Sequence, residues 1–234
     1  MDLKEEDILG AAIGSHWYYR CKAAALSSAV GALAPRRLLD VGAGSGFFSK
    51  HLLSHGGAES ALCVDTGYAH DRDETVAGKP VRYRRDCGPT DCDLVLMMDV
   101  LEHVDDDRAL VRHYAERVPS GAHFLATAPA FSFLWSGHDV FLDHKRRYRL
   151  SEIEAAMRDA GLSVVFGAYY FGAIFPLAAA VRWAARGDRQ PRSSLKKHSA
   201  VMNGLLTAAC RIELPFFPLN RIAGLSAFVL ARKL

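Results

Sequence analysis

The chain has 234 residues, half of them hydrophobic and 24% of them charged, which suffices for a sizeable core and excludes an intrinsically disordered or collagen-like chain. The net charge of +3 is small, and five cysteines without paired spacing favour a reducing compartment over a disulfide framework. The acidic opening residues lack the basic and apolar regions of a secretory signal, so we expect a cytoplasmic protein, with membrane association left open.

Helices and strands alternate along most of the sequence. A helix is predicted over residues 16–34, where Gly31 and Pro35 mark its end. Short apolar runs predict strands at Arg37–Val41, Ala61–Asp65, Val81–Arg84, Asp93–Met98, Ala122–Ala128, Leu162–Tyr170 and Leu225–Ala231. The remaining predicted helices are Phe47–His55, Arg108–Val118 and a helix from Ser151 to Gly161, with Glu154 at the capping-box position. This alternation predicts an α/β fold with a mostly parallel sheet, whose ligands bind at the carboxyl ends of the strands.

A glycine-rich turn follows the first predicted strand and opens a helix. After Asp40 it contains Gly42, Gly44 and Gly46, which permit a tight turn and a close approach of ligand to backbone. Asp65 ends the next strand, 21 residues after Gly44, where a carboxylate can accept both ribose hydroxyls. The turn lacks the dinucleotide spacing and a phosphate-binding lysine, and its leading acid suits a cationic ligand. The sequence therefore predicts a nucleoside site.

The stretch LLDVGAGSGFFSKHL resembles motif I of class I S-adenosylmethionine (SAM)-dependent methyltransferases, of the type 11/12-like group. The resemblance continues through CVDTGY, Asp86-Cys87 and DLVLMMDVLEHVDD, over roughly residues 35–130. It implies a Rossmann-like, doubly wound sheet of seven strands in the order 3-2-1-4-5-7-6. It also implies SAM as the cofactor, with Asp40 and the glycines at the methionine moiety, Asp65 at the ribose, and Asp86 or the Cys87 amide at the adenine.

The resemblance implies a single domain over 1–234. Its parts are an N-terminal helical cap (1–34), a cofactor-binding core (35–170), a helical insertion (171–222) and the last strand (223–234). The segment HWYYR at 16–20 resembles the HWWF-x-x-R segment that precedes motif I in one group of these enzymes. There the helix closes over the cofactor, and Arg20 would pair with the SAM carboxylate. The alternative is an amphipathic packing helix with a surface arginine.

Asp99, Glu102 and His103 lie just after the fourth predicted strand. If a helix starts there, they share one face, and two carboxylates with an imidazole make a divalent-cation site plausible. The pattern resembles the E-x-x-E-H of small-RNA 2′-O-methyltransferases and of ubiquinone-pathway O-methyltransferases. That resemblance implies that Asp99, Glu102, His103 and His144 bind Mg²⁺ or Mn²⁺, although Asp99 is shorter than the family's Glu. Alternatives are His103 or His144 as a catalytic general base, or a structural role.

Further candidates for a fourth ligand lie in the segments 136–139 and 143–148. The pattern W-S-x-H-D…H-x-R-R-Y resembles a bacterial group of type-12-like methyltransferases. Its basic tract, Lys145–Arg149, is either an anion clamp or a solvated face.

The segment 171–222 is apolar and basic. It contains eight Lys or Arg and two acids, so it carries +6 and the remainder carries −3. Its first part, Phe171–Trp183, is too short to span a membrane and contains Pro176, and Val201–Ile212 is a further apolar helix candidate. Three interpretations stay open: a peripheral membrane element, a lid over a hydrophobic acceptor pocket, and a packed helical layer or dimer interface.

These features predict a SAM-dependent methyltransferase that methylates a hydrophobic or amphiphilic small molecule, at oxygen, by alignment and deprotonation of the acceptor. One alternative is an RNA 2′-O-methyltransferase, which the D-x-x-E-H…D-H-K pattern favours and the absence of an added RNA-binding module disfavours. Another is a non-catalytic SAM-binding scaffold, which the intact Asp65 and glycine turn disfavour. The acceptor and the oligomeric state are not set by the sequence.

Overall fold

A computed structural model describes residues 8–184, 190–191, 193 and 198–234. Its sheet is formed by β1 (Arg37–Val41), β2 (Ser60–Val64), β3 (Arg72–Val76), β4 (Lys79–Arg84), β5 (Leu94–Met98), β6 (His123–Pro129), β7 (Leu162–Tyr170) and β8 (Ser226–Lys233). The strands lie in the order β3-β4-β2-β1-β5-β6-β8-β7. Strands β4, β2, β1, β5 and β6 are parallel, while β3, and β8 with its neighbours, pair antiparallel.

The helices are α2 (Trp17–Val30), α3 (Phe47–His55), α4 (Asp107–Ala115), α5 (Gly137–Phe141), α6 (Leu150–Asp159), α7 (Phe175–Ala184) and α8 (Ala200–Glu213). Short 3₁₀ segments are η1 (Gly10–Ser15), η2 (Gly31–Leu33), η3 (Leu101–His103), η4 (Ser132–Leu134) and η5 (Leu214–Leu219). The helix expected from Ser151 starts one residue earlier, and Glu152, not Glu154, accepts the capping hydrogen bond from the Arg149 amide at 2.6 Å. Among the described residues, no helix is long and apolar enough to cross a membrane.

The sheet has eight strands, whereas the sequence predicts seven. The additional strand is β3, so the predicted count and strand order are wrong at that strand. It pairs antiparallel with β4 at the edge of the sheet through a tight turn at Ala77 and Gly78, which have φ of 51° and 77°. Its sequence, RDETV, offers no apolar run, and its side chains are held by charge instead: Asp73 accepts a hydrogen bond from Arg84 at 2.7 Å. Without β3, the other seven strands keep the expected relative places.

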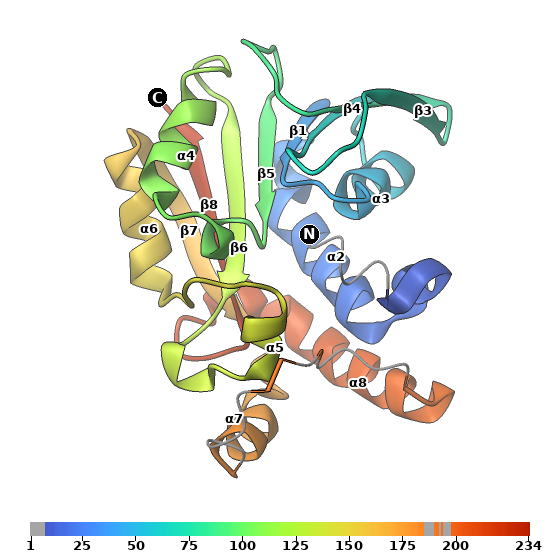
Figure 1. The fold of residues 1–234 in the computed structure, drawn as a ribbon, viewed down its shortest axis with the longest axis vertical. Coiled ribbons are helices and arrows are strands. Elements are labelled where there is room, and N and C mark those ends of the chain that lie inside the picture. Colours follow the sequence, from blue (N-terminus) through green and yellow to red (C-terminus); the bar gives the residue numbers. More distant parts are fainter. Residues whose placement is uncertain (1–7, 185–189, 192, 194–197) are drawn as a thin grey trace.

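The sheet is covered on both faces (Figure 1). Helices α2, α3 and α8 pack on one face, and α4 and α6 pack on the other. Along β5, Leu94, Leu96 and Met98 enter the first cluster of buried residues, whereas Val95 and Met97 enter the second. A strand buried on both faces explains the uninterrupted apolar run in this part of the sequence.

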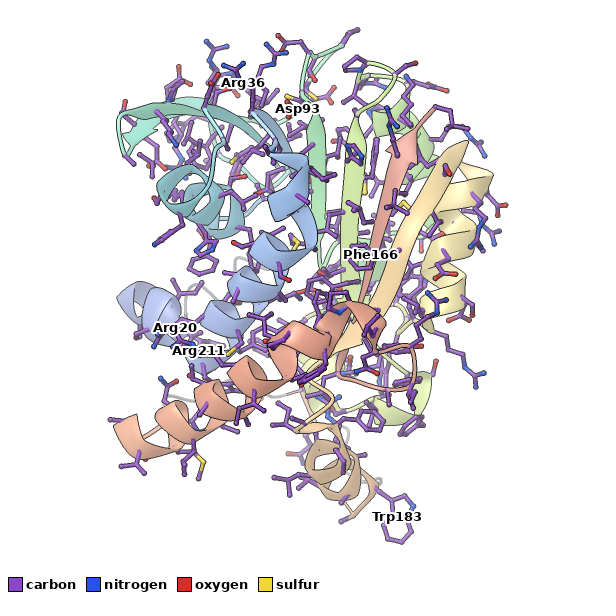
Figure 2. All side chains as sticks on the ribbon, turned by 180° about the vertical axis from the view of Figure 1, so that it is seen from behind. Arg20, Arg36, Asp93, Phe166, Trp183 and Arg211 are labelled. Atoms are coloured by element: carbon purple, nitrogen blue, oxygen red, sulfur yellow. The ribbon has the colours of Figure 1, made fainter. Side chains whose placement is uncertain are left out.

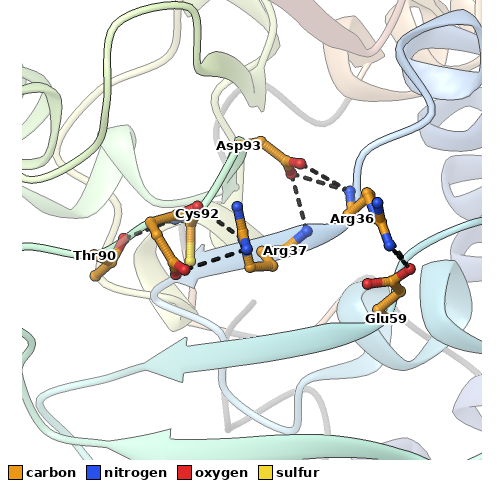
Figure 3. A network of polar contacts seen from close by, with 7 residues as sticks. Arg36, Arg37, Glu59, Thr90, Cys92 and Asp93 are labelled. Atoms are coloured by element: carbon orange, nitrogen blue, oxygen red, sulfur yellow. Dashed lines mark hydrogen bonds and ion pairs between the residues drawn. The ribbon is translucent and has the colours of Figure 1, made fainter.

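A polar network fixes the amino ends of the parallel strands, at the edge opposite the carboxyl ends (Figure 3). The Asp93 carboxylate accepts hydrogen bonds from the backbone amides of Arg36 and Arg37, at 3.0–3.1 Å, and so ties β1 to β5. The Arg36 side chain also pairs with Glu59 at the start of β2. These contacts set the strand register that aligns the carboxyl ends.

The insertion supplies α7, α8 and η5 between β7 and β8. The side chain of Asn203 attaches α8 to the start of α2: it accepts from the Trp17 amide at 2.8 Å and donates to the Ser15 carbonyl at 3.1 Å. In contrast, α7 has no buried residue, and Trp183 points away from the body of the protein (Figure 2).

Candidate active site

The glycine-rich turn has the backbone that its composition requires. Gly42, Gly44 and Gly46 have φ of 63°, 54° and 72°, the left-handed region that side chains disfavour. A methyl group at Gly42 would lie 2.7 Å from a Val100 methyl, and one at Gly46 would lie 2.7 Å from the Tyr83 hydroxyl. The turn therefore packs closely against the ends of β4 and β5. Its glycine backbone also has the conformation that a ligand-binding turn needs.

Asp65 is placed at this turn. Its carboxylate accepts hydrogen bonds from the Gly44 amide at 3.0 Å and from the Gly67 amide at 2.8 Å. Asp86 lies just after β4, the neighbouring strand, and accepts from the Cys87 amide at 2.8 Å. Asp86 is exposed, whereas Asp65 and Cys87 are half-buried. The structure thus brings Asp65 to the glycine turn and puts Asp86 and Cys87 after the next strand.

Asp40 lies beneath the turn, not on its surface. It is 2% exposed and accepts a hydrogen bond from the Ser49 hydroxyl of α3 at 2.7 Å. Burial raises the pKa of this carboxyl to about 6, against the opposing effect of Ser49. Its assignment to the methionine moiety stays a prediction.

The structure does not place Arg20 in the role expected for it. Arg20 is exposed and lies beside Arg211 of α8, as the view from behind shows (Figure 2). The two arginines line a cavity of 490 Å³ between α2, α3 and α8, together with Lys50. None of its lining residues belongs to the glycine turn or to the ends of β5 and β6.

Lys22 is the cationic residue of α2 that lies at the carboxyl end of β5, where it meets Asp99. Its side chain is fully buried, pairs with Asp99 and donates to the Tyr18 hydroxyl at 3.1 Å. Burial opposes the charge, but Asp99 outweighs it and raises the pKa of Lys22. The sequence held this signal, because the basic residue of the HWWF-x-x-R pattern falls on position 22 when the pattern starts at His16.

The pairing with Lys22 also removes Asp99 from the predicted metal ligands. Asp99 has a φ of 56°, and the helical turn begins only at Leu101, so the expected shared helix face does not form. The Asp99 carboxylate instead accepts from Lys22 and, at 3.0 Å, from the Thr127 hydroxyl.

The other three predicted ligands do converge. One ligand atom from each of Glu102, His103 and His144 lies within 4.8 Å of the others. Glu102 is fully buried, and neither of its carboxylate oxygens has a hydrogen-bond partner among the described residues. Burial, and then the charge of Asp99, raises the pKa of Glu102 well above its usual value. Two unpartnered buried oxygens beside two imidazoles fit a divalent cation, or the proton of an acceptor hydroxyl.

Asp139, from the segment 136–139, supports this group without joining it. It is fully buried and lies 3.0 Å from the Nδ1 of His144, and Arg147 pairs with it at 2.6 Å. A carboxylate on Nδ1 fixes the imidazole and leaves Nε2 as the nitrogen for a ligand or a proton. The basic tract is therefore divided: Arg147 is internal, while Lys145 pairs with Asp105 at the surface.

The loop that carries these residues is closed at its base. Ala130 and Tyr148 form an isolated parallel bridge. The Phe131 amide donates to the Tyr148 carbonyl at 2.9 Å, and the Tyr148 amide donates to the Pro129 carbonyl at 2.9 Å. This pairing holds the start and the end of the loop side by side at the end of β6.

A cavity of 160 Å³ opens beside the group. Its apolar walls come from α2, the end of β6 and the loops before β8, and its polar lining comes from the site and from α7. The lining residues are Trp17, Tyr18, Asp99, Glu102, His103, Pro129, His138, Leu142, His144, Arg147, Arg182, Leu225 and Ser226. His138 belongs to the segment 136–139, which the sequence marked as a candidate source of a fourth ligand. Arg182 was not predicted here, because its place depends on how the insertion folds back.

The chain resembles known proteins in sequence and in fold. It is 33% identical over 152 residues to the ubiquinone biosynthesis O-methyltransferase of Paramagnetospirillum magneticum, covering 54% of this chain and 59% of the relative. It is 30% identical over 156 residues to that of Pseudomonas savastanoi, covering 56% and 66%. The match thus spans less than two thirds of either relative. The YcgJ protein from Bacillus subtilis shares the fold, with a TM-score of 0.53 at 15% identity, covering 91% and 98% of the two chains.

A family model described as a methyltransferase domain matches residues 16–165. The matched region runs from the first residues of α2 into β7 and includes the glycine turn, Asp65, Glu102 and His144. It is the region in which the sequence resembles the motifs of class I enzymes, and it covers more than half of the chain. The chain therefore belongs to the methyltransferase domain family.

Proposed function

We propose that this methyltransferase transfers the methyl group of SAM to a hydroxyl of a hydrophobic or amphiphilic small molecule. The observation that carries the proposal is the group of Glu102, His103 and His144, which faces a largely apolar cavity at the carboxyl ends of β5 and β6. The names of the relatives, ubiquinone biosynthesis O-methyltransferases, support transfer to oxygen.

In this proposal SAM occupies the glycine turn, with Asp65 at the ribose and Asp86 or the Cys87 amide at the adenine. Lys22 replaces Arg20 as the cation for the SAM carboxylate. The support is local: Val100 lies beside Gly42 of the turn, and the neighbouring Asp99 pairs with Lys22 and lines the cavity. A methyl donor held there would point its sulfonium toward the acceptor, and alignment would supply most of the catalysis.

Deprotonation of the acceptor hydroxyl falls to the converging group. His144, oriented by Asp139, accepts the proton at Nε2, and His103 and Glu102 hold the hydroxyl in place. The same three side chains would hold Mg²⁺ or Mn²⁺, which would lower the pKa of the hydroxyl. Asp99 has no part in that ligand set, because it is neutralised by Lys22.

The test uses SAM with a radiolabelled methyl group and a cell extract as the source of acceptors, with the label partitioned between lipids, small polar molecules and RNA. We expect label in the organic or small-molecule fraction. We expect His144→Ala and Asp139→Asn to lower the rate by at least about a hundredfold, because base and orienting carboxylate act together. Arg149→Gln, an exposed change in the same tract, serves as the control.

Each other outcome has a meaning. Label in RNA would establish the RNA 2′-O-methyltransferase instead, and SAM binding without transfer to any fraction would establish the scaffold. A chelator that abolishes transfer, with recovery on adding Mn²⁺, would support the metal role of Glu102, His103 and His144. Indifference to the chelator would leave His144 as a metal-free base.

We also propose that the insertion contacts an anionic membrane surface. Along α8, Val201, Leu205 and Ile212 lie on one face and are 62–73% exposed. On η5 and after it, Leu219 and Ile222 are 81% and 89% exposed. The same insertion carries a net charge of +6, which suits anionic headgroups around an apolar surface.

A further inference from the structure

We propose that the acceptor carries an anionic group, a carboxylate or a phosphate, and that Arg182 of the insertion binds it with help from the indole N–H of Trp17. The inference rests on the proposed methyl transfer and specifies its substrate class. Both residues line the same cavity as Glu102 and His144.

Arg182 is a cation in the cavity wall without an anionic partner among the described residues. The guanidinium nitrogen Nη1 of Arg182 donates a hydrogen bond to the Leu134 carbonyl at 2.7 Å. Within the described part of the chain, the Arg182 side chain makes no other hydrogen bond. A guanidinium has five N–H donors, so that bond leaves most of its capacity for a ligand. The fork geometry of an arginine matches a carboxylate or a phosphate, which it can bind through two parallel hydrogen bonds.

The surroundings of Arg182 oppose its charge. Burial, and then the positive charge of Arg147, lowers its pKa to about 10. Arg147 has Asp139 as its own partner, so that carboxylate is already engaged with Arg147 and His144. An incoming anion would offset the repulsion between the arginines and give the half-buried Arg182 a partner of opposite charge.

Trp17 supplies an independent observation. Its indole nitrogen Nε1 is buried and has no hydrogen-bond partner among the described residues. A buried donor of this kind is costly unless something accepts its hydrogen bond, and Trp17 lines the cavity that the acceptor would occupy. The indole N–H can only donate a hydrogen bond, and so can a guanidinium. Trp17 and Arg182 therefore both suit a ligand group that is rich in hydrogen-bond acceptors.

Glu102 has a different requirement, because among the described residues nothing forms a hydrogen bond with either of its carboxyl oxygens, and an acceptor hydroxyl can pair with them. The cavity therefore suits a molecule that carries both a hydroxyl, for Glu102 and His144, and an anionic group, for Arg182 and Trp17. Leu142, Pro129 and the ring of Tyr18 supply apolar walls to the same cavity. Hydroxylated aromatic acids and phosphorylated hydroxy compounds have this pattern.

Three related probes test the proposal. Catechol is neutral, 3,4-dihydroxybenzoate adds a carboxylate to it, and 3,4-dihydroxyphenylphosphonate adds a phosphonate. Dissociation constants are measured by isothermal titration calorimetry with the full chain saturated with S-adenosylhomocysteine. We expect the wild type to bind at least one anionic probe about tenfold or more tightly than catechol, the range of a charge-assisted hydrogen bond. Comparison of carboxylate and phosphonate identifies which anion the cavity prefers.

The variants assign that preference to residues. Arg182→Gln should abolish the preference for the anionic probe over catechol, and Arg182→Lys should keep part of it. Trp17→Phe should weaken the preference several-fold, because it keeps an aromatic ring but removes the indole N–H. Arg211→Gln, an exposed arginine of the same insertion, should leave it unchanged. Unaltered affinity for S-adenosylhomocysteine verifies that each variant is folded.

Equal wild-type binding of catechol and both anions, no binding of any probe, or a preference that survives Arg182→Gln would overturn the proposal. Methyl transfer from labelled SAM to catechol, assayed in the same wild type, reports on the proposed function separately. Transfer without an anionic preference would refute only the acceptor class. A preference without transfer to any of the probes or to extract would refute the methyl transfer while retaining an anion site.

Discussion

Lys22 and Asp99 place two opposite charges next to each other at the cavity that Asp99 lines. The Lys22 side chain is fully buried and that of Asp99 is 25% exposed, so each depends on the other for compensation. A buried charge pair is costly to break from one side, because the remaining charge keeps its desolvation penalty. The pair therefore has a structural role beside the cofactor-binding role proposed for Lys22, and the two can be separated experimentally.

We expect Lys22→Met to lower the free energy of unfolding by about 3–5 kcal/mol, the usual cost of leaving one buried charge unpaired. The double variant Lys22→Met/Asp99→Asn should recover much of that loss, since it leaves no isolated charge. Urea denaturation of the wild type, Lys22→Met, Asp99→Asn and the double variant gives the coupling energy between the two side chains. Equal losses in the single and double variants would contradict the coupling.

Asp40 makes stability depend on pH in a defined direction. The pKa of its carboxyl is 3.8 when unperturbed and about 6 in the folded chain, so the folded state holds a proton that the unfolded state releases. Its contribution to stability is therefore fully present below about pH 4 and is lost as the pH rises to about 6. Relative to Asp40→Asn, the wild type should lose about 3 kcal/mol across this window.

Denaturant titrations at pH 4, 5, 6 and 7 measure this difference. Ser49→Ala offers a check, because the Ser49 hydroxyl stabilises the ionised carboxylate. Its removal should raise the pKa of Asp40 further and move the window upward. Parallel pH profiles for the wild type and Asp40→Asn would show that Asp40 is not protonated in the folded chain.

At the scale of elements, α8 is attached to the body of the protein through a small number of polar contacts. Asn203 joins α8 to the end of η1 and the start of α2, and Thr207 and Cys210 are the buried residues of this helix. Trp17, whose amide Asn203 binds, lines the acceptor cavity. The position of the insertion is thereby linked to the shape of the site.

We expect Asn203→Ala to increase amide hydrogen exchange in α8 and around Ser15 and Trp17, because two backbone groups lose their partners. The local cost is about 1–3 kcal/mol, which corresponds to a loss of protection of about fivefold to 150-fold. Met202→Ala, an exposed neighbour on the same helix, is the matched control. Unchanged exchange in the Asn203 variant would mean that apolar packing alone holds α8.

The elements also show which features the sequence could reveal. The parallel strands β1, β2, β5 and β6 were predictable because burial on both faces leaves an apolar run. The polar edge strand β3 carries no such signal. Likewise, Glu102 and His103 are neighbours in sequence and their proximity could be expected, whereas His144 reaches them through a loop whose closure depends on backbone pairing at Tyr148. Lys22 could be found from its motif position, but its pairing with Asp99 depends on the left-handed backbone at Asp99.

At the scale of the whole molecule, exposed apolar side chains gather on the insertion. Leu177, Val181 and Trp183 of α7 are 60–68% exposed, and α8 and η5 add the residues described above. Arg20 of α2 and Arg211 of α8 line a second cavity, and no acid is among the described residues that line it. An anionic bilayer would cover the apolar side chains while the arginines remained at the headgroups.

We expect the protein to sediment with vesicles that contain phosphatidylglycerol, and salt to weaken the binding by screening the arginines. Leu205→Glu/Ile212→Glu should reduce binding about tenfold or more, because two side chains lose their burial in the bilayer. Val165→Glu, at an exposed site on β7, is the control. Binding that is unaffected by the α8 variants would contradict the proposal, and a dimer that these variants dissociate would show that a second copy covers this surface.

The bridge between Ala130 and Tyr148 has a consequence for how such proteins diversify. Because the loop leaves and rejoins the sheet at one point, a loop of different length or sequence can be joined there without moving β6 or α6. His144, Asp139 and Arg147 all lie inside that boundary, whereas the glycine turn and Asp65 lie outside it. A chimaera that exchanges 130–148 with a relative would therefore test whether acceptor choice is inherited as a separable segment, independent of the part of the chain that holds the methyl donor.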